Sequence, residues 1–262
     1  MSKTVTNNVK ITRVSNACIL MEMGGHAILT DPFFINTKMI GIKEDVAIDP
    51  EDLPPLTAII GCHDIVDHWQ MKGLADYPHD KDLVKVYVAM KGQVKSARKY
   101  GFNNAEVLQW GETRTIGGLT IEAVKAQKMM VWRVNNYVLR YGEVSVFFGS
   151  EARDLEPLEA YRKKNGPVDI AVFPTNGVHL FGFYQLVMKG EEAVEGTKIL
   201  GAKKLFVIHD AHPEIPGFIH IKSSRQDAIR KAFSREVPKV DVVHVNPGIL
   251  WDYDVVNKIG VV

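Results

Sequence analysis

The sequence of 262 residues contains only two cysteines, Cys18 and Cys62, which are too few for a disulfide framework and form no Cys-x-x-Cys pair. No stretch approaches the roughly 20 apolar residues of a membrane-spanning helix, and residues 1–8 lack the apolar core of a signal peptide. Neither sign of charge dominates, because 32 basic residues face 31 acidic ones. We therefore expect a cytoplasmic protein that binds neither nucleic acid nor membrane.

The chain also lacks internal repeats, low-complexity segments, obvious linkers and the glycine patterns that bind nucleotides. A composition of 46% hydrophobic and 24% charged residues is ordinary for a globular protein long enough to bury a large core. One large domain and two closely packed halves both fit this composition. Because no linker is visible, we expect a single domain over residues 1–262.

Short alternating segments separated by glycine pairs dominate the first half and indicate β-hairpins, whereas helical patterns alternate with apolar strands after residue 153. The last predicted strand covers residues 242–245. This order favours an α+β protein with two mixed sheets covered by outer helices. A long loop over residues 33–55 has the length that is typical of functional loops, and we expect it near the site.

Two imidazoles and a carboxylate follow the apolar run 56–60, in a segment that contains His63, Asp67 and His68. A strand that ends in such a loop is a common way to fix metal ligands, because the rigid backbone sets where the side chains point. Cys62 in the same segment is better explained as a small buried residue than as a nucleophile. The segment therefore predicts a metal site.

The segment resembles the His-x-His-x-Asp-His motif of the metallo-β-lactamase superfamily, with Ile65 in place of the middle histidine. Further landmarks are similar to those of the family. These are the hairpin 17–32 with its Asp-Pro end, segment 147–151 at the usual Gly-Asp-Thr position, and strand 205–209 before the last histidine. Segment 188–194 resembles the ascorbate 6-phosphate lactonase-like branch. The resemblance covers roughly residues 9–250 and implies a four-layer αββα fold.

The resemblance implies one damaged and one complete metal position. The first metal of the family would face His63, Ile65 and Lys128, and an isoleucine has no lone pair to offer a metal. The second metal would face Asp67, His68 and His209, which are all suitable ligands. Ser150 replaces the bridging aspartate of the family, and Glu151 next to it is a candidate substitute that stands one residue out of register.

The resemblance implies a hydrolase that uses one divalent metal, zinc or manganese, and a metal-bound water against a small lactone or ester, phosphorylated ones included. His63 and Lys128 are the candidate catalytic residues, since an ammonium group could stabilise negative charge where the first metal is lost. We expect Lys128→Met to abolish turnover and to leave metal binding intact. The predicted substrate contacts are His179, Ser150 and Glu151.

A second interpretation carries comparable weight. Once two ligands and the bridge are lost, the remaining histidines and Asp67 could form a hydrogen-bonded cluster without any metal, around Lys128. The protein would then be catalytically silent and would bind a small anionic ligand or act as an assembly partner. Relatives in the family often form homo-oligomers, but the sequence fixes no number of subunits and identifies no substrate.

Overall fold

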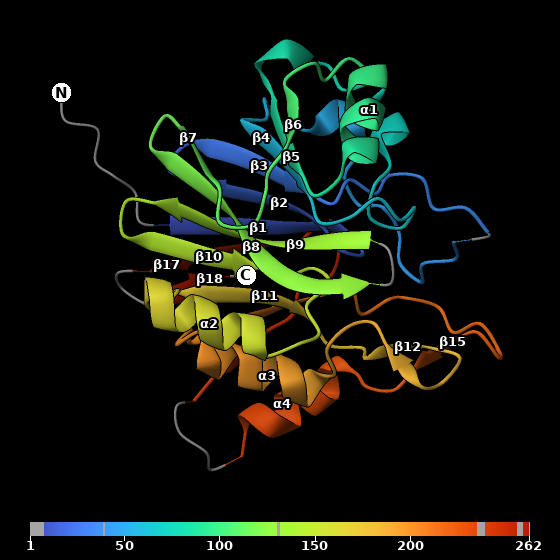
Figure 1. Ribbon diagram of the computed structural model, residues 1–262, viewed down its shortest axis with the longest axis vertical. Coiled ribbons are helices and arrows are strands. Elements are labelled where there is room, and N and C mark those ends of the chain that lie inside the picture. Colours follow the sequence, from blue (N-terminus) through green and yellow to red (C-terminus); the bar gives the residue numbers. More distant parts are fainter. Residues whose placement is uncertain (1–7, 39, 130–131, 235–238, 256–258, 262) are drawn as a thin grey trace.

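Two mixed β-sheets pack face to face, and helices cover their outer surfaces, which confirms the predicted αββα class (Figure 1). The computed structural model describes residues 8–38, 40–129, 132–234, 239–255 and 259–261, without the side chains of 128–129, 132 and 259–261. Helix α1 (Lys91–Lys99) lies over the first sheet. Helices α2 (Glu156–Asn165), α3 (Gly190–Ile199) and α4 (Arg225–Ala232) lie over the second.

The first sheet has the strand order β18-β17-β1-β2-β3-β4-β5-β6. Its strands are β1 (Asn8–Ser15), β2 (Cys18–Met23), β3 (His26–Thr30), β4 (Ala58–Gly61), β5 (Lys85–Val88), β6 (Ala105–Val107), β17 (Leu250–Asp254) and β18 (Ile259–Val261). The second sheet has the order β16-β14-β11-β10-β9-β8-β7. Its strands are β7 (Thr113–Ile116), β8 (Leu119–Met129), β9 (Trp132–Tyr141), β10 (Val144–Phe148), β11 (Ile170–Pro174), β14 (Lys204–Ile208) and β16 (Asp241–Val243).

Each sheet changes from antiparallel to parallel pairing along its width. Strands β1 to β3 form an antiparallel meander, whereas β3 to β6 are parallel; β7 to β10 are antiparallel, whereas β10, β11, β14 and β16 are parallel. The carboxyl ends of parallel strands meet at one edge of a sheet, which is where such sheets present ligand-binding loops. The loops that leave β3, β4, β10, β11 and β14 are therefore candidates for the site.

The core between the sheets is built from side chains that alternate along the strands. Ile11 and Met21 of the first sheet share one buried cluster with Ile121, Val146 and Phe206 of the second. Other clusters lie between each sheet and its helices. Burial of about 25 cal/mol per Å² of apolar surface makes these layers the main favourable contribution to folding. The sheets thus hold the site-bearing strand ends in place.

Most predicted elements are present, but the prediction that residues 242–245 form the last strand is wrong. Strand β17 follows and pairs with β1, and Trp251 and Tyr253 turn inward while their neighbours are partly exposed. The turn after Pro247 and the acidic residues Asp252 and Asp254 obscured this alternation in the sequence. No helix in the described part of the chain is long and apolar enough to cross a membrane.

A third, small sheet lies at the open end of the two large ones and was not predicted. It contains β13 (Tyr184–Gln185), β12 (Val178–Leu180) and β15 (Ile219–Ile221), in that order. The long loop after β3 also reaches this region, where Lys43 donates a backbone hydrogen bond of 2.8 Å to the carbonyl of Ala211. Both segments form walls of the cavity described next.

Candidate metal centre

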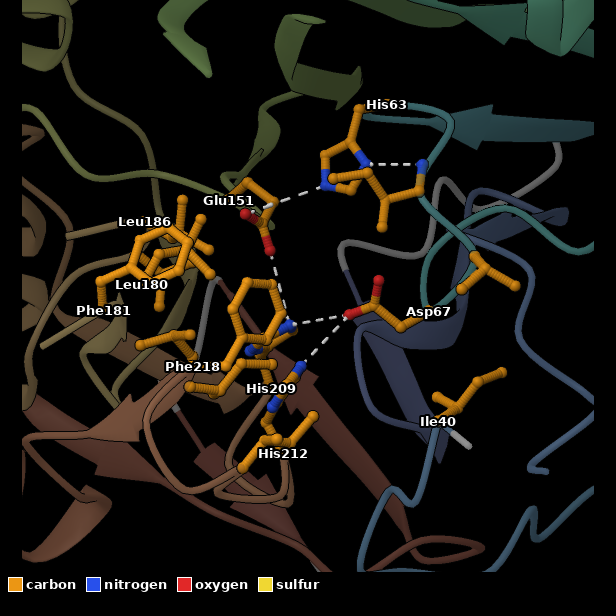
Figure 2. Close-up of a pocket in the computed structure, with 16 residues that line it drawn as sticks. Ile40, His63, Asp67, Glu151, Leu180, Phe181, Leu186, His209, His212 and Phe218 are labelled. Atoms are coloured by element: carbon orange, nitrogen blue, oxygen red, sulfur yellow. Dashed lines mark hydrogen bonds and ion pairs between the residues drawn. The ribbon is translucent and has the colours of Figure 1, made fainter. Parts of the chain in front are cut away.

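A cavity of about 450 Å³ opens where the carboxyl ends of the parallel strands meet (Figure 2). Five ionisable side chains reach it, namely His63, Asp67, Glu151, His209 and His212. The remaining lining residues are apolar: Ile40, Ile65, Val66, Val178, Leu180, Phe181, Leu186, Val187, Ile215, Phe218 and Ile219. A mostly apolar pocket with a few converging polar groups is the usual form of a small-molecule site.

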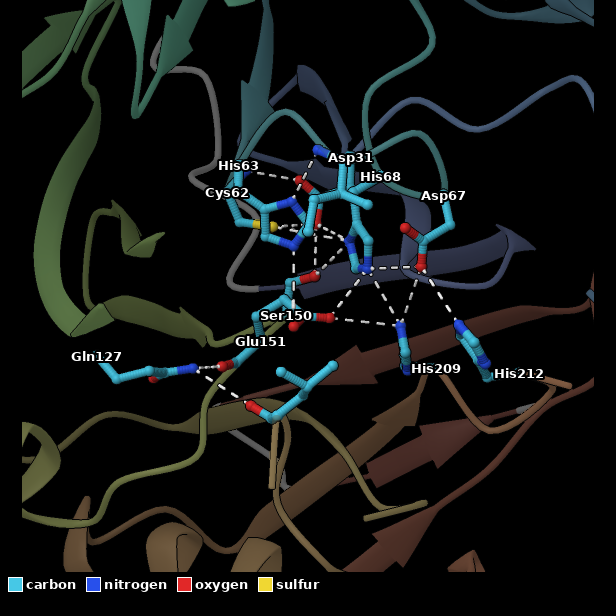
Figure 3. A network of polar contacts seen from close by, with 12 residues as sticks. Asp31, Cys62, His63, Asp67, His68, Gln127, Ser150, Glu151, His209 and His212 are labelled. Atoms are coloured by element: carbon cyan, nitrogen blue, oxygen red, sulfur yellow. Dashed lines mark hydrogen bonds and ion pairs between the residues drawn. The ribbon is translucent and has the colours of Figure 1, made fainter. Parts of the chain in front are cut away.

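Four side chains direct their donor atoms to one point beside this cavity (Figure 3). The Nε2 atoms of His68 and His209 lie 3.1 Å apart. Asp67 Oδ2 is 3.4 Å from His68 Nε2 and 3.7 Å from His209 Nε2. Glu151 Oε1 is 3.0 Å and 3.4 Å from the same two nitrogens. Asp67, His68 and His209, the three ligands predicted from the sequence, are thus brought together, and Glu151 joins them.

These separations fit one divalent metal ion. Donors about 2.0–2.1 Å from a tetrahedral zinc ion are about 3.3 Å from one another, which is close to the 3.1, 3.4 and 3.7 Å that separate the donor atoms of Asp67, His68 and His209. Imidazoles and carboxylates are also suitable donors for zinc or manganese. Among the described residues, Asp67, His68 and His209 form one of two groups of three whose ligand atoms all lie within 4.8 Å of one another, and the other is Cys62, His63 and His68. The residues present therefore fit the metal that the sequence predicts.

The backbone around the site is held in strained conformations. His209 has a φ of 58°, Asn16 a φ of 51° and Asp31 a φ of 37°, values that residues with a side chain rarely adopt. The backbone N–H of His209 donates to the carbonyl of Asn16 at 3.1 Å, and the Asn16 side chain donates to the carbonyl of Asp67 at 2.9 Å. Such strain persists only where the surroundings fix it, and it is common at functional sites.

His68 is oriented from behind by a buried carboxylate. Its Nδ1 lies 3.0 Å from Asp31 Oδ2, and Asp31 also accepts hydrogen bonds from the Cys62 backbone N–H at 2.7 Å and from the Ser150 hydroxyl (Figure 3). Because the Nδ1 proton of His68 points to Asp31, its Nε2 lone pair faces the other donors. A carboxylate behind a metal-binding histidine typically fixes its tautomer and raises its affinity.

His209 has a similar partner in Asn176, which follows β11. Asn176 Nδ2 lies 3.4 Å from His209 Nδ1, whereas the amide oxygen of Asn176 is buried without a hydrogen-bond partner. Rotating the side-chain amide of Asn176 by a half-turn places its oxygen against the Nδ1 proton of His209, so that both groups gain a hydrogen-bond partner. The two orientations of the amide occupy the same space. The Nε2 lone pair of His209 then faces that of His68, an arrangement that requires a proton or a cation between them.

The charges in the cluster are coupled. Burial alone would lower the pKa of His68, but the Asp67 carboxylate, Cys62 and Glu151 raise it well above its ordinary value. Burial would raise the pKa values of Asp67 and Glu151, yet the neighbouring His68 holds both well below their usual range. Protons on the imidazoles thus balance the carboxylates when no metal is bound. A divalent ion at the same atoms would displace these protons.

His63 belongs to the cavity but not to the four donors. Its Nδ1 accepts the backbone N–H of Ile65 at 3.1 Å, so the ring proton sits on Nε2, which has no hydrogen-bond partner. This Nε2 lies 3.8 Å from Glu151 Oε2, and the side chain is only 1% exposed. The ring therefore presents an N–H donor at Nε2 and no lone pair for a metal at that atom.

His212, in the loop that follows His209, also lines the cavity. Its Nδ1 donates to the carbonyl of Pro213 at 3.0 Å, which leaves a lone pair on Nε2. That atom lies 3.7 Å from Asp67 Oδ2. Burial and the neighbouring His209 lower the pKa of His212. The ring is thus positioned to accept a proton.

The predicted substrate contacts occupy other positions. Ser150 is fully buried, and its hydroxyl contacts Asp31 and lies 3.2 Å from His68 Nδ1, so it supports the donors from behind. Glu151 lines the cavity as a donor. His179 does not line the cavity, because it alternates with Val178 and Leu180, which do. Its Nδ1 donates instead to the carbonyl of Gly177 at 2.7 Å.

The position where the family motif has its middle histidine forms part of the apolar wall of the cavity in this protein. Ile65 lines the cavity and packs against Cys62, Ala126 and Val134. Lys128 lies in β8 opposite Arg133, just after an irregularity in the strand register. Its side chain lies outside the described residues, so its catalytic role stays a prediction.

The sequence did not assign Asp31, Asn176 and His212 to the site. Asp31 was noted only as part of an Asp-Pro signature, although a carboxylate directly after a parallel strand could have suggested a role. Asn176 is likewise a polar residue shortly after a parallel strand, β11. His212 gave none, because its loop has no regular pattern that would place it in space.

Comparisons with known proteins agree with this geometry. A family model described as "Beta-lactamase superfamily domain" matches residues 10–209. A UPF0173 metal-dependent hydrolase of Pyrococcus horikoshii is 22% identical over 210 residues, which cover 77% of this chain and 84% of the relative.

Two solved structures share the fold at low sequence identity. The first is a possible metal-dependent hydrolase of Veillonella parvula, with a TM-score of 0.76, 15% identity, and coverage of 92% of this chain and 98% of the other. The second is an isothiocyanate hydrolase from Delia radicum gut bacteria, with a TM-score of 0.73, 19% identity, and coverage of 92% and 97%.

Proposed function

Since the chain belongs to the metallo-β-lactamase superfamily, we propose that it is a metal-dependent hydrolase that acts through one divalent metal ion on a small ester or lactone. The observation that carries this proposal is the convergence of four donors, with His68 Nε2 and His209 Nε2 3.1 Å apart and Glu151 Oε1 within 3.4 Å of both. Without a cation, such a cluster must hold buried charges that are costly unless paired.

Each side chain has a role in this proposal. Asp67, His68, His209 and Glu151 hold the metal. When bound, a divalent metal lowers the pKa of a water molecule to about 7 and polarises a carbonyl group. His212 Nε2 accepts the proton of the attacking water and then passes it to the leaving oxygen, while the Nε2–H of His63 donates a hydrogen bond to the negative charge that develops on the substrate. Water adds to the carbonyl carbon and the bond to the leaving oxygen breaks, which yields an acid and an alcohol.

Metal content tests the proposal directly. We expect about one zinc or manganese ion per chain by elemental mass spectrometry after purification without chelator. Asp67→Asn and Glu151→Gln should lose it, because each removes a charged donor from the cluster. Asp64→Asn is the matched control in the same loop, since Asp64 Oδ2 points to Gly92 at the start of α1.

Three results would contradict the proposal. These are no metal after incubation with zinc and manganese, two metals per chain, and equal metal loss in the Asp64→Asn control. The loaded protein is then screened with esters and lactones, phosphorylated ones included. An isothiocyanate belongs in the same screen, because an isothiocyanate hydrolase shares the fold. Absence of turnover with metal bound would favour a catalytically silent protein.

A further inference from the structure

The walls of the cavity are more informative about the substrate than the donors are. No lysine or arginine side chain of the described part lines the cavity, and eleven of its sixteen lining residues are aliphatic or aromatic. The two carboxylates, Asp67 and Glu151, neutralise the charge of one divalent ion. An anionic group on the substrate would lose its hydration against this mostly apolar lining, with no described lysine or arginine to pair with it.

The small sheet places two aromatic rings at the mouth of this cavity. Phe181 and Phe218 line it, and their ring centroids are 5.3 Å apart in an edge-to-face arrangement. They are grouped with Leu180 and Leu186 on one side of the cavity, opposite Ile40 (Figure 2). The rings remain 57% and 44% exposed, which is unfavourable for large apolar side chains in water.

The backbone holds these rings in place before any ligand arrives. Phe181 has a φ of 52°, in the left-handed region, and its N–H donates to the carbonyl of Phe218 at 2.8 Å. The N–H of Phe218 donates to the carbonyl of Ile215 at 2.9 Å. Holding a strained residue with its ring exposed is costly, and such strain is a feature of ligand-binding segments. An apolar group placed between the rings and the donors would cover this surface.

We propose that the substrate is an uncharged ester or lactone with an apolar acyl part, which packs against Phe181 and Phe218 while its carbonyl faces Asp67, Glu151 and His209. This inference rests on the proposed hydrolase function and narrows its substrate class to neutral, apolar compounds. The reaction is the hydrolysis given above, and the acyl part remains in contact with the rings until the acid leaves.

The test compares two esters of equal leaving group and similar size. 4-Nitrophenyl pentanoate is neutral, whereas the mono-4-nitrophenyl ester of succinic acid carries a carboxylate at the end of its acyl chain. Because this carboxylate expels 4-nitrophenolate from its own ester to give succinic anhydride, the rate without protein is measured by stopped flow and subtracted. With the metal-loaded protein, we expect kcat/KM to be at least about tenfold higher for the pentanoate. Phe218→Ala should lower kcat/KM for the pentanoate about tenfold and leave that for the succinate unchanged.

Phe183→Ala is the matched control. Phe183 is 79% exposed and stacks on Phe181 at 6.2 Å, but it does not line the cavity. Its replacement should leave both values of kcat/KM unchanged. Equal or faster hydrolysis of the succinate ester would overturn the inference. So would conversion of an oligomer to a monomer by both phenylalanine variants in sedimentation, because the rings would then contact a second copy of the chain.

Binding distinguishes failure of this inference from failure of the proposed function. If the loaded protein hydrolyses neither ester, the hydrolase proposal fails, and calorimetric titration with N-(4-nitrophenyl)pentanamide and the corresponding succinamic acid decides the ligand class. Tighter binding of the neutral amide, weakened by Phe218→Ala and unaffected by Phe183→Ala, would support the apolar ligand. Equal binding of both amides would overturn it.

Discussion

His63 shows how one motif residue can change its task when its neighbours change. In the family motif the first histidine accompanies the middle one, but here Ile65 offers no donor atom, and its backbone N–H occupies Nδ1 of His63. The remaining Nε2 proton points toward Glu151 Oε2, 3.8 Å away. The same residue thus serves as a hydrogen-bond donor beside the metal site rather than as a ligand.

We therefore expect His63→Gln to separate metal binding from turnover. The variant should keep its metal, because His63 is not one of the four donors, and should lose about 10²- to 10³-fold in kcat, the usual cost of removing one hydrogen-bond donor to a developing negative charge. Metal content by elemental mass spectrometry and kcat for the best ester of the screen check this. Loss of the metal in this variant would assign His63 to the ligand set.

His79→Gln controls for the loss of an imidazole. His79 Nε2 contacts the carbonyl of Leu53, and the side chain does not line the cavity. Its replacement should change neither metal content nor kcat. A comparable decrease in kcat for both variants would show that the effect of His63→Gln is not specific.

The motif spacing predicted Asp67, His68 and His209 as a group, because the fold fixes where each loop leaves its strand. Spacing assigned Glu151 to substrate contact, since it stands one residue beyond the expected bridging position. The structure explains the shift. Ser150 turns toward Asp31, and the side-chain amide of Gln127 contacts the carbonyl of Glu151, so the Glu151 carboxylate points to the donors. This exchange of roles between Ser150 and Glu151 is visible only in the structure of the turn.

At the scale of elements, the contact between α3 and α4 supports the site from a distance. Gly190 opens α3, and its N–H donates to the hydroxyl of Ser223 at 2.9 Å. Ser223 in turn donates its backbone N–H to the carbonyl of Asn176 at 3.1 Å, next to His209. The start of α3, the start of α4 and the loop after β11 thus form one hydrogen-bonded unit.

Gly190→Ala should therefore destabilise the protein by about 1–3 kcal/mol, the usual cost of overpacking. A Cβ at this position would lie 2.5 Å from the backbone nitrogen of Ala228 and 2.6 Å from the carbonyl oxygen of Ser224, so α4 would have to move. Urea unfolding of the metal-free protein measures the change. Gly92→Ala is the control in the first turn of α1, where the nearest atom is the side-chain oxygen of Asp64 at 3.1 Å.

We expect Gly92→Ala to change the free energy of unfolding by less than about 1 kcal/mol, because alanine is also the better helix former. A Gly190→Ala variant as stable as the wild type would contradict the close packing of α3 and α4.

Elements with strong local patterns were predictable, and those that depend on tertiary contacts were not. Glycine pairs marked the hairpins at 24–25 and 117–118. The small sheet has strands of two or three residues, too short for any period to be visible. Phe181 and Phe218, whose rings lie beside this sheet, were therefore identified as part of the site only from the structure.

At the scale of the whole molecule, the donors come from both large sheets. Asp67 and His68 follow β4 of the first sheet, whereas Glu151 follows β10 and His209 follows β14 of the second. The positions of the sheets thus determine the geometry of the donors, and a metal held by all four would connect the two sheets. The four-layer class was predictable from the order of elements, but this meeting of loops about 80 to 140 residues apart required the family resemblance.

Metal binding should consequently stabilise the entire fold. A ligand that binds only the folded state adds about 2.7 kcal/mol to the free energy of unfolding at 100 times its Kd, and about 4.1 kcal/mol at 1,000 times. We expect zinc to raise the Tm of the metal-free protein in a concentration-dependent way, as measured by scanning calorimetry, and an excess of chelator to reverse the rise. The His209→Ala variant should show no such increase, because it loses one of the two donors that come from the second sheet. Equal stabilisation of wild type and variant would place the zinc elsewhere, whereas stabilisation of the wild type alone would assign the coupling between the sheets to this centre.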